Sequence, residues 1–316
     1  MTEERSKADE LFEDALDLII RLQEDPKNPV AHELIARWRE RSPEHEAAWA
    51  EAAEIHGMAG KVIDDQRKAE RTVSRRSIIL GGTIGIIAAG TGALFGPELL
   101  LHARADHFTS TAELRQIDLP DGSIVMLGPD SALKAQVTPT LRSVELLAGM
   151  AFFQVSPDTS RPFRVLADEM TINVLGTAFD ISKDANSLNV SVEHGLVETV
   201  IPVKSPGQGE MLSKGDWLTL DKQSLHIERG NRDINLIAAW RDGMIVAERE
   251  TVASVIARIA RWQPGQVMIA DPRFGMLRIS GVFDLGDPLA AFEAVVHPHG
   301  GKVRQLSPWL TIISPI

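Results

Sequence analysis

Few side chains in this sequence are arranged so that they could carry out chemistry. His297 and His299 flank Pro298 and could hold a metal ion, but two nearby histidines without a carboxylate partner are more typical of a loop. The 316 residues include no cysteine, which excludes disulfides, thiolate metal sites and cysteine nucleophiles. The sequence contains no nucleophile elbow, HExxH zinc motif or P-loop. We therefore expect no enzyme, no cofactor and no metal site.

The apolar run at residues 78–96 is the most informative element of the chain. It reads IILGGTIGIIAAGTGALFG and contains no charged side chain. About 20 apolar residues in a helix cross the ~30 Å hydrocarbon core of a bilayer. A helix in a soluble core usually keeps a polar face, whereas only Thr83 and Thr91 interrupt this run. The sequence therefore predicts one transmembrane helix between two soluble parts.

Lysine and arginine residues beside this run predict its orientation, because they collect on the cytoplasmic side of a membrane. The residues concerned are Lys61, Arg67, Lys68, Arg71, Arg75 and Arg76 before the run, and Arg104 and Arg115 over a similar distance after it. This asymmetry places the N-terminus in the cytoplasm and the longer C-terminal part on the other side.

The twin arginines Arg75 and Arg76 leave a second interpretation open. They lie in SRRSIIL, which resembles a twin-arginine export motif, and Ala103-Arg104-Ala105 resembles a small-residue cleavage site. Against cleavage, more than 70 residues precede the apolar run, and they themselves read as folded. We expect an uncleaved anchor whose twin arginines either direct export or only supply positive charge.

Residues 1–76 read as short helices. The first has helical apolar spacing from Leu11 to Leu22, and a third begins at Ser42-Pro43, with serine as the N-cap. So small a module commonly gains stability by binding a partner. Leu18, Trp38 and Trp49 are the candidate contacts, although tryptophans at these positions are equally typical of a core. The net charge of −11 argues against nucleic acid as that partner.

After the apolar run the pattern changes to period two. Alternating residues 114–119 and the run 124–127 flank Asp121-Gly122, which is a strong hairpin signal. More short strands follow at intervals of about ten residues and predict a sandwich or open β-roll. From residue 239 onward the order changes to β-α-β-β-α-β-β, which indicates a compact α+β module.

The expected architecture is therefore multi-domain, with a small all-α cytoplasmic domain, one transmembrane helix, a mostly-β domain and a C-terminal α+β domain. The boundaries are 1–60 for the helical domain, 61–77 for a basic juxtamembrane segment, 78–96 for the transmembrane helix, 110–203 for the β domain, 204–238 for a connection and 239–316 for the α+β domain.

This layout and several motifs resemble the FecR-type transmembrane regulators, the anti-sigma factors of cell-surface signalling in Gram-negative bacteria. The motifs are WRERSPEHEAAW (38–49), LPDGSIVMLGPDSAL (119–133), RSVELLAGMAFFQV (142–155), RPFRV (161–165), VLGTAFDI (174–181), VSVEHGLVE (190–198), AWRDGMIV (239–246) and RISGVFDLGDPLAAF (278–292). They occur in the family's order on both sides of the apolar run.

The resemblance implies a function. The helical domain, through Leu18, Trp38 and Trp49, would bind an extracytoplasmic-function (ECF) sigma factor. The outer domains would contact the signalling domain of a TonB-dependent outer-membrane receptor, usually one that imports an iron chelate. An intramembrane protease would then release the sigma factor. The chain would lie in the inner membrane, with its C-terminus in the periplasm.

The resemblance also draws attention to the Gly176-Thr177 bond, because some family members resemble self-cleaving proteins at the matching position. The Thr177 hydroxyl would attack the Gly176 carbonyl and give an ester that water hydrolyses. The reaction requires a strained peptide, which glycine permits. The alternative is that Gly176 forms a β-bulge and Thr177 makes a turn hydrogen bond.

Two other classes of function remain open in the sequence. One is an exported β-protein with a twin-arginine signal, either a binding module or an enzyme of the periplasm. The other is a structural anchor that organises a cell-envelope complex.

Overall fold

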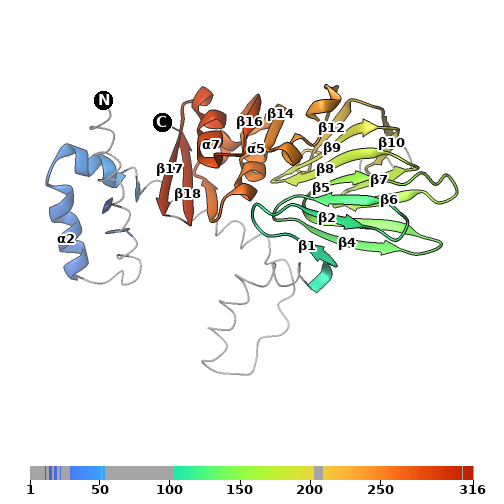
Figure 1. Ribbon diagram of the computed structural model, residues 1–316. Coiled ribbons are helices and arrows are strands. Elements are labelled where there is room, and N and C mark those ends of the chain that lie inside the picture. Colours follow the sequence, from blue (N-terminus) through green and yellow to red (C-terminus); the bar gives the residue numbers. More distant parts are fainter. Residues whose placement is uncertain are drawn as a thin grey trace.

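The computed structural model describes residues 11, 14, 15, 18, 19, 22, 29–50, 52, 53, 101, 103–202, 209–307 and 309–315. Within these ranges the chain forms a helical module, a β module and a C-terminal α+β module, and the α+β module lies between the other two (Figure 1). The expected juxtamembrane segment 61–77 and transmembrane run 78–96 fall outside the described residues. In the described part, no helix combines the length and apolar character that crossing a bilayer demands.

The helical module contains α2 (Pro29–Arg39) and a helix over residues 43–50. Ser42 separates the two helices, and its hydroxyl accepts a hydrogen bond from the His45 amide, as an N-cap does. Ile35 and Trp38 are buried on one side of α2. Their apolar cluster continues onto the C-terminal module.

The β module is a continuous network of strands folded into two layers. Its strands are β1 (His107–Phe108), β2 (Arg115–Asp118), β3 (Ile124–Leu127), β4 (Ala132–Val137), β5 (Arg142–Gln154), β6 (Phe163–Ala167), β7 (Met170–Val174), β8 (Ala178–Asp184), β9 (Ser187–His194), β10 (Val197–Val200), β11 (Gly209–Leu212), β12 (Asp216–Asp221) and β13 (Ile227–Asn231). The expected hairpin at Asp121-Gly122 joins β2 to β3.

Strand β5 belongs to both layers. Its first half pairs with β4 and β6, and its second half pairs with β3 and β8. The strand turns between layers at Gly149, whose φ is +82° and where a Cβ would lie 1.9 Å from the Ser131 hydroxyl. Only glycine fits there. Inward-facing side chains such as Phe153, Phe163 and Phe179 fill the core between the layers.

The expected assignment of residues 204–238 to a connection is wrong, because most of this segment belongs to the β module. Strands β11, β12 and β13 lie in this segment and complete the β module, with β11 paired to β10 and β12 paired to β9. The short linker that follows contains a 3-10 turn, η1 (Ile234–Leu236). The β module therefore extends well beyond residue 203.

The C-terminal module has two small sheets around two helices. Its elements are η2 (Ala239–Asp242), β14 (Met244–Thr251), α5 (Val252–Ile259), η3 (Ala260–Trp262), β15 (Gln266–Ile269), α6 (Pro272–Gly275), β16 (Arg278–Asp284), α7 (Pro288–Val296), η4 (His297–His299), β17 (Gly301–Ser307) and β18 (Leu310–Pro315). Strand β14 pairs with β16, while β18 lies between β15 and β17. The order is the expected one with α6 added. Thr251 and Asp287 cap α5 and α7 with their side-chain oxygens.

Candidate functional sites

The β module and the C-terminal module share a buried joint. Met150, Phe152 and Ala178 of the β module belong to the same apolar cluster as Trp240 and the inner face of α5. The Arg241 guanidinium lies 3.7 Å from the centre of the Phe152 ring. Because this core is continuous, the two modules are held together as one outer unit.

Arg258 of α5 forms the ionic centre of this joint. Its guanidinium lies 2.7 Å from Asp184 of β8 and 2.6 Å from Glu250 of β14, and Arg261 lies 2.7 Å from the other Asp184 oxygen. Asp184 is fully buried, and the side chain of Arg258 is 7% exposed. Two cations and two carboxylates thus balance one another across the boundary between the modules.

The pKa values of this cluster follow from its pairing. Burial acts to raise the pKa of Asp184, but Arg258, Arg261 and the Ser182 hydroxyl outweigh it and hold the pKa below its usual value. Burial likewise acts to lower the pKa of Arg258, and its two carboxylate partners raise it instead. Asp184 and Arg258 therefore stay charged at neutral pH.

Asp180, also in β8, lies in a different environment. The Trp240 indole N–H donates to its Oδ1 over 2.8 Å. Burial raises the pKa of this carboxyl to about 6, even though the Trp240 hydrogen bond and the charges of Arg258 and Arg241 act against the rise. The joint thus contains one carboxyl that titrates close to neutral pH.

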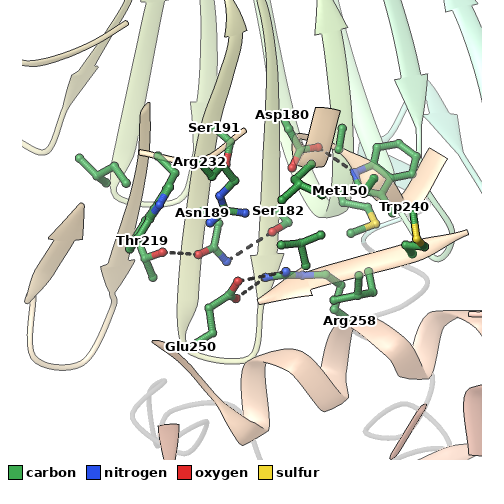
Figure 2. Close-up of a pocket in the computed structure, with 18 residues that line it drawn as sticks. Met150, Asp180, Ser182, Asn189, Ser191, Thr219, Arg232, Trp240, Glu250 and Arg258 are labelled. Atoms are coloured by element: carbon green, nitrogen blue, oxygen red, sulfur yellow. Dashed lines mark hydrogen bonds and ion pairs between the residues drawn. The ribbon is translucent and has the colours of Figure 1, made fainter. Parts of the chain in front are cut away.

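A cavity of about 30 Å³ lies in the joint (Figure 2). Thr219, Asn189 and Ser182 form a hydrogen-bonded chain along one wall, with distances of 2.6 and 3.4 Å. A buried water occupies roughly 10–15 Å³ by this measure, so the cavity has room for about two waters. It is far smaller than the pockets that hold metabolites. The joint is therefore a structural connection rather than a substrate site.

The histidine pair considered as metal ligands lies in η4. Nε2 of His299 is 3.1 Å from the carbonyl oxygen of Arg278, and its ring packs edge-on to Phe274. Across the described residues, no group of three histidine, cysteine or acidic side chains is placed to hold a metal ion. His299 therefore contacts a backbone carbonyl of the C-terminal module.

The Gly176-Thr177 bond lies in the connection between β7 and β8. A Cβ at Gly176 would lie 2.8 Å from Cα of Pro157, so the close approach of that loop requires glycine. The carbonyls on either side of Gly176 both accept bonds from this loop, from the Asp158 amide to Leu175 and from the Val155 amide to Thr177, each at 2.8 Å. Hydrogen bonds from this loop therefore fix the backbone on both sides of Gly176.

The structural alternative, a β-bulge at Gly176 with a turn hydrogen bond from Thr177, does not match the structure. The bulge lies in β9, where Glu193 is the extra residue opposite Ala178 and Phe179, and not at Gly176. Thr177 is 5% exposed, and its hydroxyl oxygen is buried without a hydrogen-bond partner in the described structure. The expected turn hydrogen bond is thus not found among the described residues.

The candidate sigma-factor contacts occupy different environments. Trp38 is 5% exposed and packs edge-on to His45, while Leu18 is also buried. Trp49 is half-buried beneath the Arg39 guanidinium. Leu34, on the outer side of α2, is 52% exposed, the most of any large apolar side chain that the structure describes in this module. Arg75 and Arg76 lie outside the described residues.

Sequence reasoning missed the ionic joint because its members are far apart in the chain. Asp184 and Arg258 are separated by 74 residues. The one local signal is Arg258 itself, which lies three residues after Val255 on the apolar face of α5. A charge at such a position requires a buried partner.

Comparisons with known proteins identify two regions of the chain. Residues 105–198 match the FecR protein family, and residues 13–55 match a domain of unknown function, DUF4880. Two crystal structures of a candidate anti-sigma factor from Parabacteroides distasonis ATCC 8503, at 1.65 and 2.50 Å resolution, align with a TM-score of 0.59 and 25% identity. Each alignment covers 66% of this chain and 98% of that protein. No curated protein matches the sequence.

Proposed function

Because this chain is a FecR-type protein, we propose that it is a single-pass anti-sigma regulator of the inner membrane. The observation that carries the proposal is the arrangement of its parts. The DUF4880 match at 13–55 and the FecR match at 105–198 lie on opposite sides of the charge-free run 78–96. The similarity to a candidate anti-sigma factor supports the same function. Anti-sigma factors are regulators rather than enzymes.

On the cytoplasmic side, residues 1–60 bind an ECF sigma factor. Trp38 and Leu18 hold the module together, and Leu34 and Trp49 supply the apolar contact, because a partner can reach only side chains that are not fully buried. On the periplasmic side, the outer unit receives a signal from the signalling domain of a TonB-dependent receptor. Cleavage of the membrane anchor by an intramembrane protease then ends the inhibition.

This topology means that the helical module cannot contact the C-terminal module of the same molecule. Its apolar cluster includes Ala270 and Ile312 of the C-terminal module. A bilayer between the two modules separates them, so the inserted protein has no such contact within one molecule. The side of the helical module that faces Ala270 and Ile312 is then open to the sigma factor, in addition to Leu34 and Trp49.

Co-purification tests the cytoplasmic half of the proposal. The full chain, extracted from membranes in detergent, is expected to retain an ECF sigma factor that mass spectrometry identifies. Leu34→Asp places a charge in the proposed contact surface and is expected to lower the amount of sigma factor retained at least tenfold. Leu196→Asp is the matched control, because Leu196 is equally open, at 59% exposed against 52%, but lies in the outer unit. Absence of the sigma factor from the wild-type preparation would refute the proposal.

We also propose self-cleavage at Gly176-Thr177 as a second activity. The buried, unpartnered Thr177 hydroxyl and the clamped carbonyls around Gly176 favour it over the structural alternative. The hydroxyl oxygen attacks the Gly176 carbonyl, the C–N bond breaks, and the nitrogen of Thr177 takes the proton. Water then hydrolyses the ester and leaves a free carboxyl on Gly176.

Two bands from purified protein, split between residues 176 and 177, are the expected sign of this reaction. Thr177→Ala is expected to give one full-length band, while Thr177→Ser retains the hydroxyl and is expected to give two. The alanine is tolerated because the wild-type hydroxyl makes no hydrogen bond. Identical bands from wild type and Thr177→Ala would contradict self-cleavage.

A further inference from the structure

The loop between β5 and β6, residues 156–161, lies directly against the Gly176-Thr177 bond. A Cβ at Gly176 would come within 2.8 Å of the Pro157 Cα. The next residue of the loop, Asp158, donates its amide to the Leu175 carbonyl over 2.8 Å. The position of this loop therefore sets how the backbone around the bond is held.

Gly195 closes the opposite side of the bond. A Cβ at Gly195 would lie 2.7 Å from Cγ2 of Thr177 and 3.1 Å from the carbonyl oxygen of Gly176. The bond thus lies between two closely packed segments of backbone. The Thr177 hydroxyl, which is buried and has no hydrogen-bond partner in the described part of the chain, is therefore confined next to the preceding carbonyl.

One buried arginine fixes the 156–161 loop. Arg142 begins β5, its side chain is 1% exposed, and its guanidinium donates to three carbonyl oxygens of the loop. Nη1 donates to Ser156 over 2.9 Å, Nη2 to Asp158 over 3.1 Å, and Nε to Arg161 over 2.9 Å. Arg142 therefore fixes the carbonyls of the residues on both sides of Pro157.

Asp121 in the β2–β3 hairpin completes the pairing of this cation. Its carboxylate lies 3.3 Å from Nη1 of Arg142, and its side chain is 2% exposed. Asp121 also accepts the Ser123 hydroxyl at 2.8 Å, and the oxygen of that hydroxyl accepts the Ser156 amide at 3.1 Å. The guanidinium makes five hydrogen bonds in all, as many as it has N–H donors. The hairpin and Arg142 thus hold the loop through one connected network.

We propose that Arg142 is a positioning residue for cleavage at Gly176-Thr177. It acts through the 156–161 loop, which holds the Gly176 carbonyl and the Thr177 hydroxyl in place for attack. In that step the Thr177 oxygen bonds to the carbonyl carbon, the C–N bond breaks, and the freed nitrogen takes the hydroxyl proton. This inference rests on the proposed self-cleavage.

Arg142→Lys tests this role in the full chain. Lysine keeps the positive charge beside Asp121, but its three N–H donors leave from one atom, so it cannot reach all three loop carbonyls at once. Pulse labelling followed by a chase measures how quickly the full-length band converts into two fragments. We expect Arg142→Lys to slow this conversion at least tenfold.

Arg258→Lys is the matched control for a loss of stability. Arg258 is also a buried arginine with carboxylate partners, but it contacts Asp184 at the opposite end of β8. The control is expected to cleave within twofold of the wild-type rate. Equal slowing in the two variants would show that cleavage responds to stability in general, and would overturn the positioning role.

Pro157→Gly supplies a second variant that leaves Arg142 and its partners in place. Pro157 is exposed, and glycine keeps the backbone carbonyls but loosens the loop at its contact with Gly176. We expect cleavage to slow at least threefold, whereas Pro264→Gly, at an exposed turn of the C-terminal module, should cleave at the wild-type rate. A wild-type rate in Pro157→Gly would show that the loop does not position the bond.

Hydroxylamine at neutral pH identifies the step that is slowed, because it splits an ester but not an amide. If the loop positions the groups for attack, full-length Arg142→Lys accumulates no ester and should stay intact in hydroxylamine. Prompt splitting of this variant would place its defect in hydrolysis of the ester and would overturn the proposal.

The outcomes separate this inference from the self-cleavage on which it rests. If the wild type splits, Thr177→Ala does not, and Arg142→Lys splits at the wild-type rate, the positioning role is wrong and self-cleavage stands. If the wild type does not split, or if Thr177→Ala gives the same fragments, both are wrong.

Discussion

Asp180 shows how one residue at the joint responds to its surroundings. It lies only four residues before Asp184 on the same strand, but Asp184 has two arginine partners and Asp180 has the neutral Trp240 indole. Burial acts to raise the pKa of both carboxyls, but the arginine charges outweigh it at Asp184, so the two pKa values shift in opposite directions. The negative charge on Asp180 weakens the joint at neutral pH.

Asp180→Asn is expected to stabilise the protein at pH 7. The folded-state pKa of about 6 lies above the ordinary 3.8, so the folded protein binds this proton more tightly than the unfolded chain does between about pH 4 and 6. The stability that Asp180 contributes therefore falls as pH rises through that window, by at most about 3 kcal/mol. Asparagine keeps an acceptor for Trp240 and does not titrate.

Urea titrations of both proteins between pH 4 and 7 measure this difference. The free energies of unfolding should converge near pH 4 and separate in favour of Asp180→Asn above pH 6. A gap between the two proteins that stays constant with pH would show that the pKa of Asp180 is not raised in the folded state.

At the scale of elements, helix α5 fastens the C-terminal module to strand β8. Arg258→Ala leaves Asp184 and Glu250 buried without their shared cation. Removing one partner from a buried ionic group costs about 3–5 kcal/mol. The variant should therefore unfold at a lower urea concentration than the wild type, as measured by circular dichroism.

Arg229→Ala is the matched control for this measurement. Arg229 also pairs with a carboxylate, Glu210, at 2.8 Å, but both side chains are about half exposed. Exposed pairs contribute roughly 0–1 kcal/mol. Equal losses in the two variants would mean that the buried cluster does not hold the joint together.

The elements that could be predicted from sequence are those with a strong local pattern. The hairpin around Asp121-Gly122 was predictable because a turn signal lies between alternating strands. Strands β11 and β13 were missed because they are short and mostly solvent-facing, so apolar alternation is absent. The Asp184–Arg258 pair has one local signal, the position of Arg258 on the apolar face of α5, and the partner could not be predicted because only the tertiary fold brings the two together.

At the scale of the whole molecule, strand β8 connects the sites of the outer unit. It begins directly after Thr177, contains Asp180 and Asp184 at the joint, and pairs with the two-layer strand β5. The C-terminal module is fixed to this same strand through α5. The joint and the Gly176-Thr177 region therefore lie at the two ends of one short strand.

We propose that one chain holds a sigma-binding module in the cytoplasm and this outer unit in the periplasm. The absence of native cysteine permits a direct measurement by single-cysteine labelling in intact cells with a permeabilised outer membrane. Ala47 and Leu196 are both exposed, in the helical and β modules respectively. A membrane-impermeant maleimide should label Leu196→Cys at once and Ala47→Cys only after the inner membrane is lysed. Equal labelling of both before lysis would contradict the account.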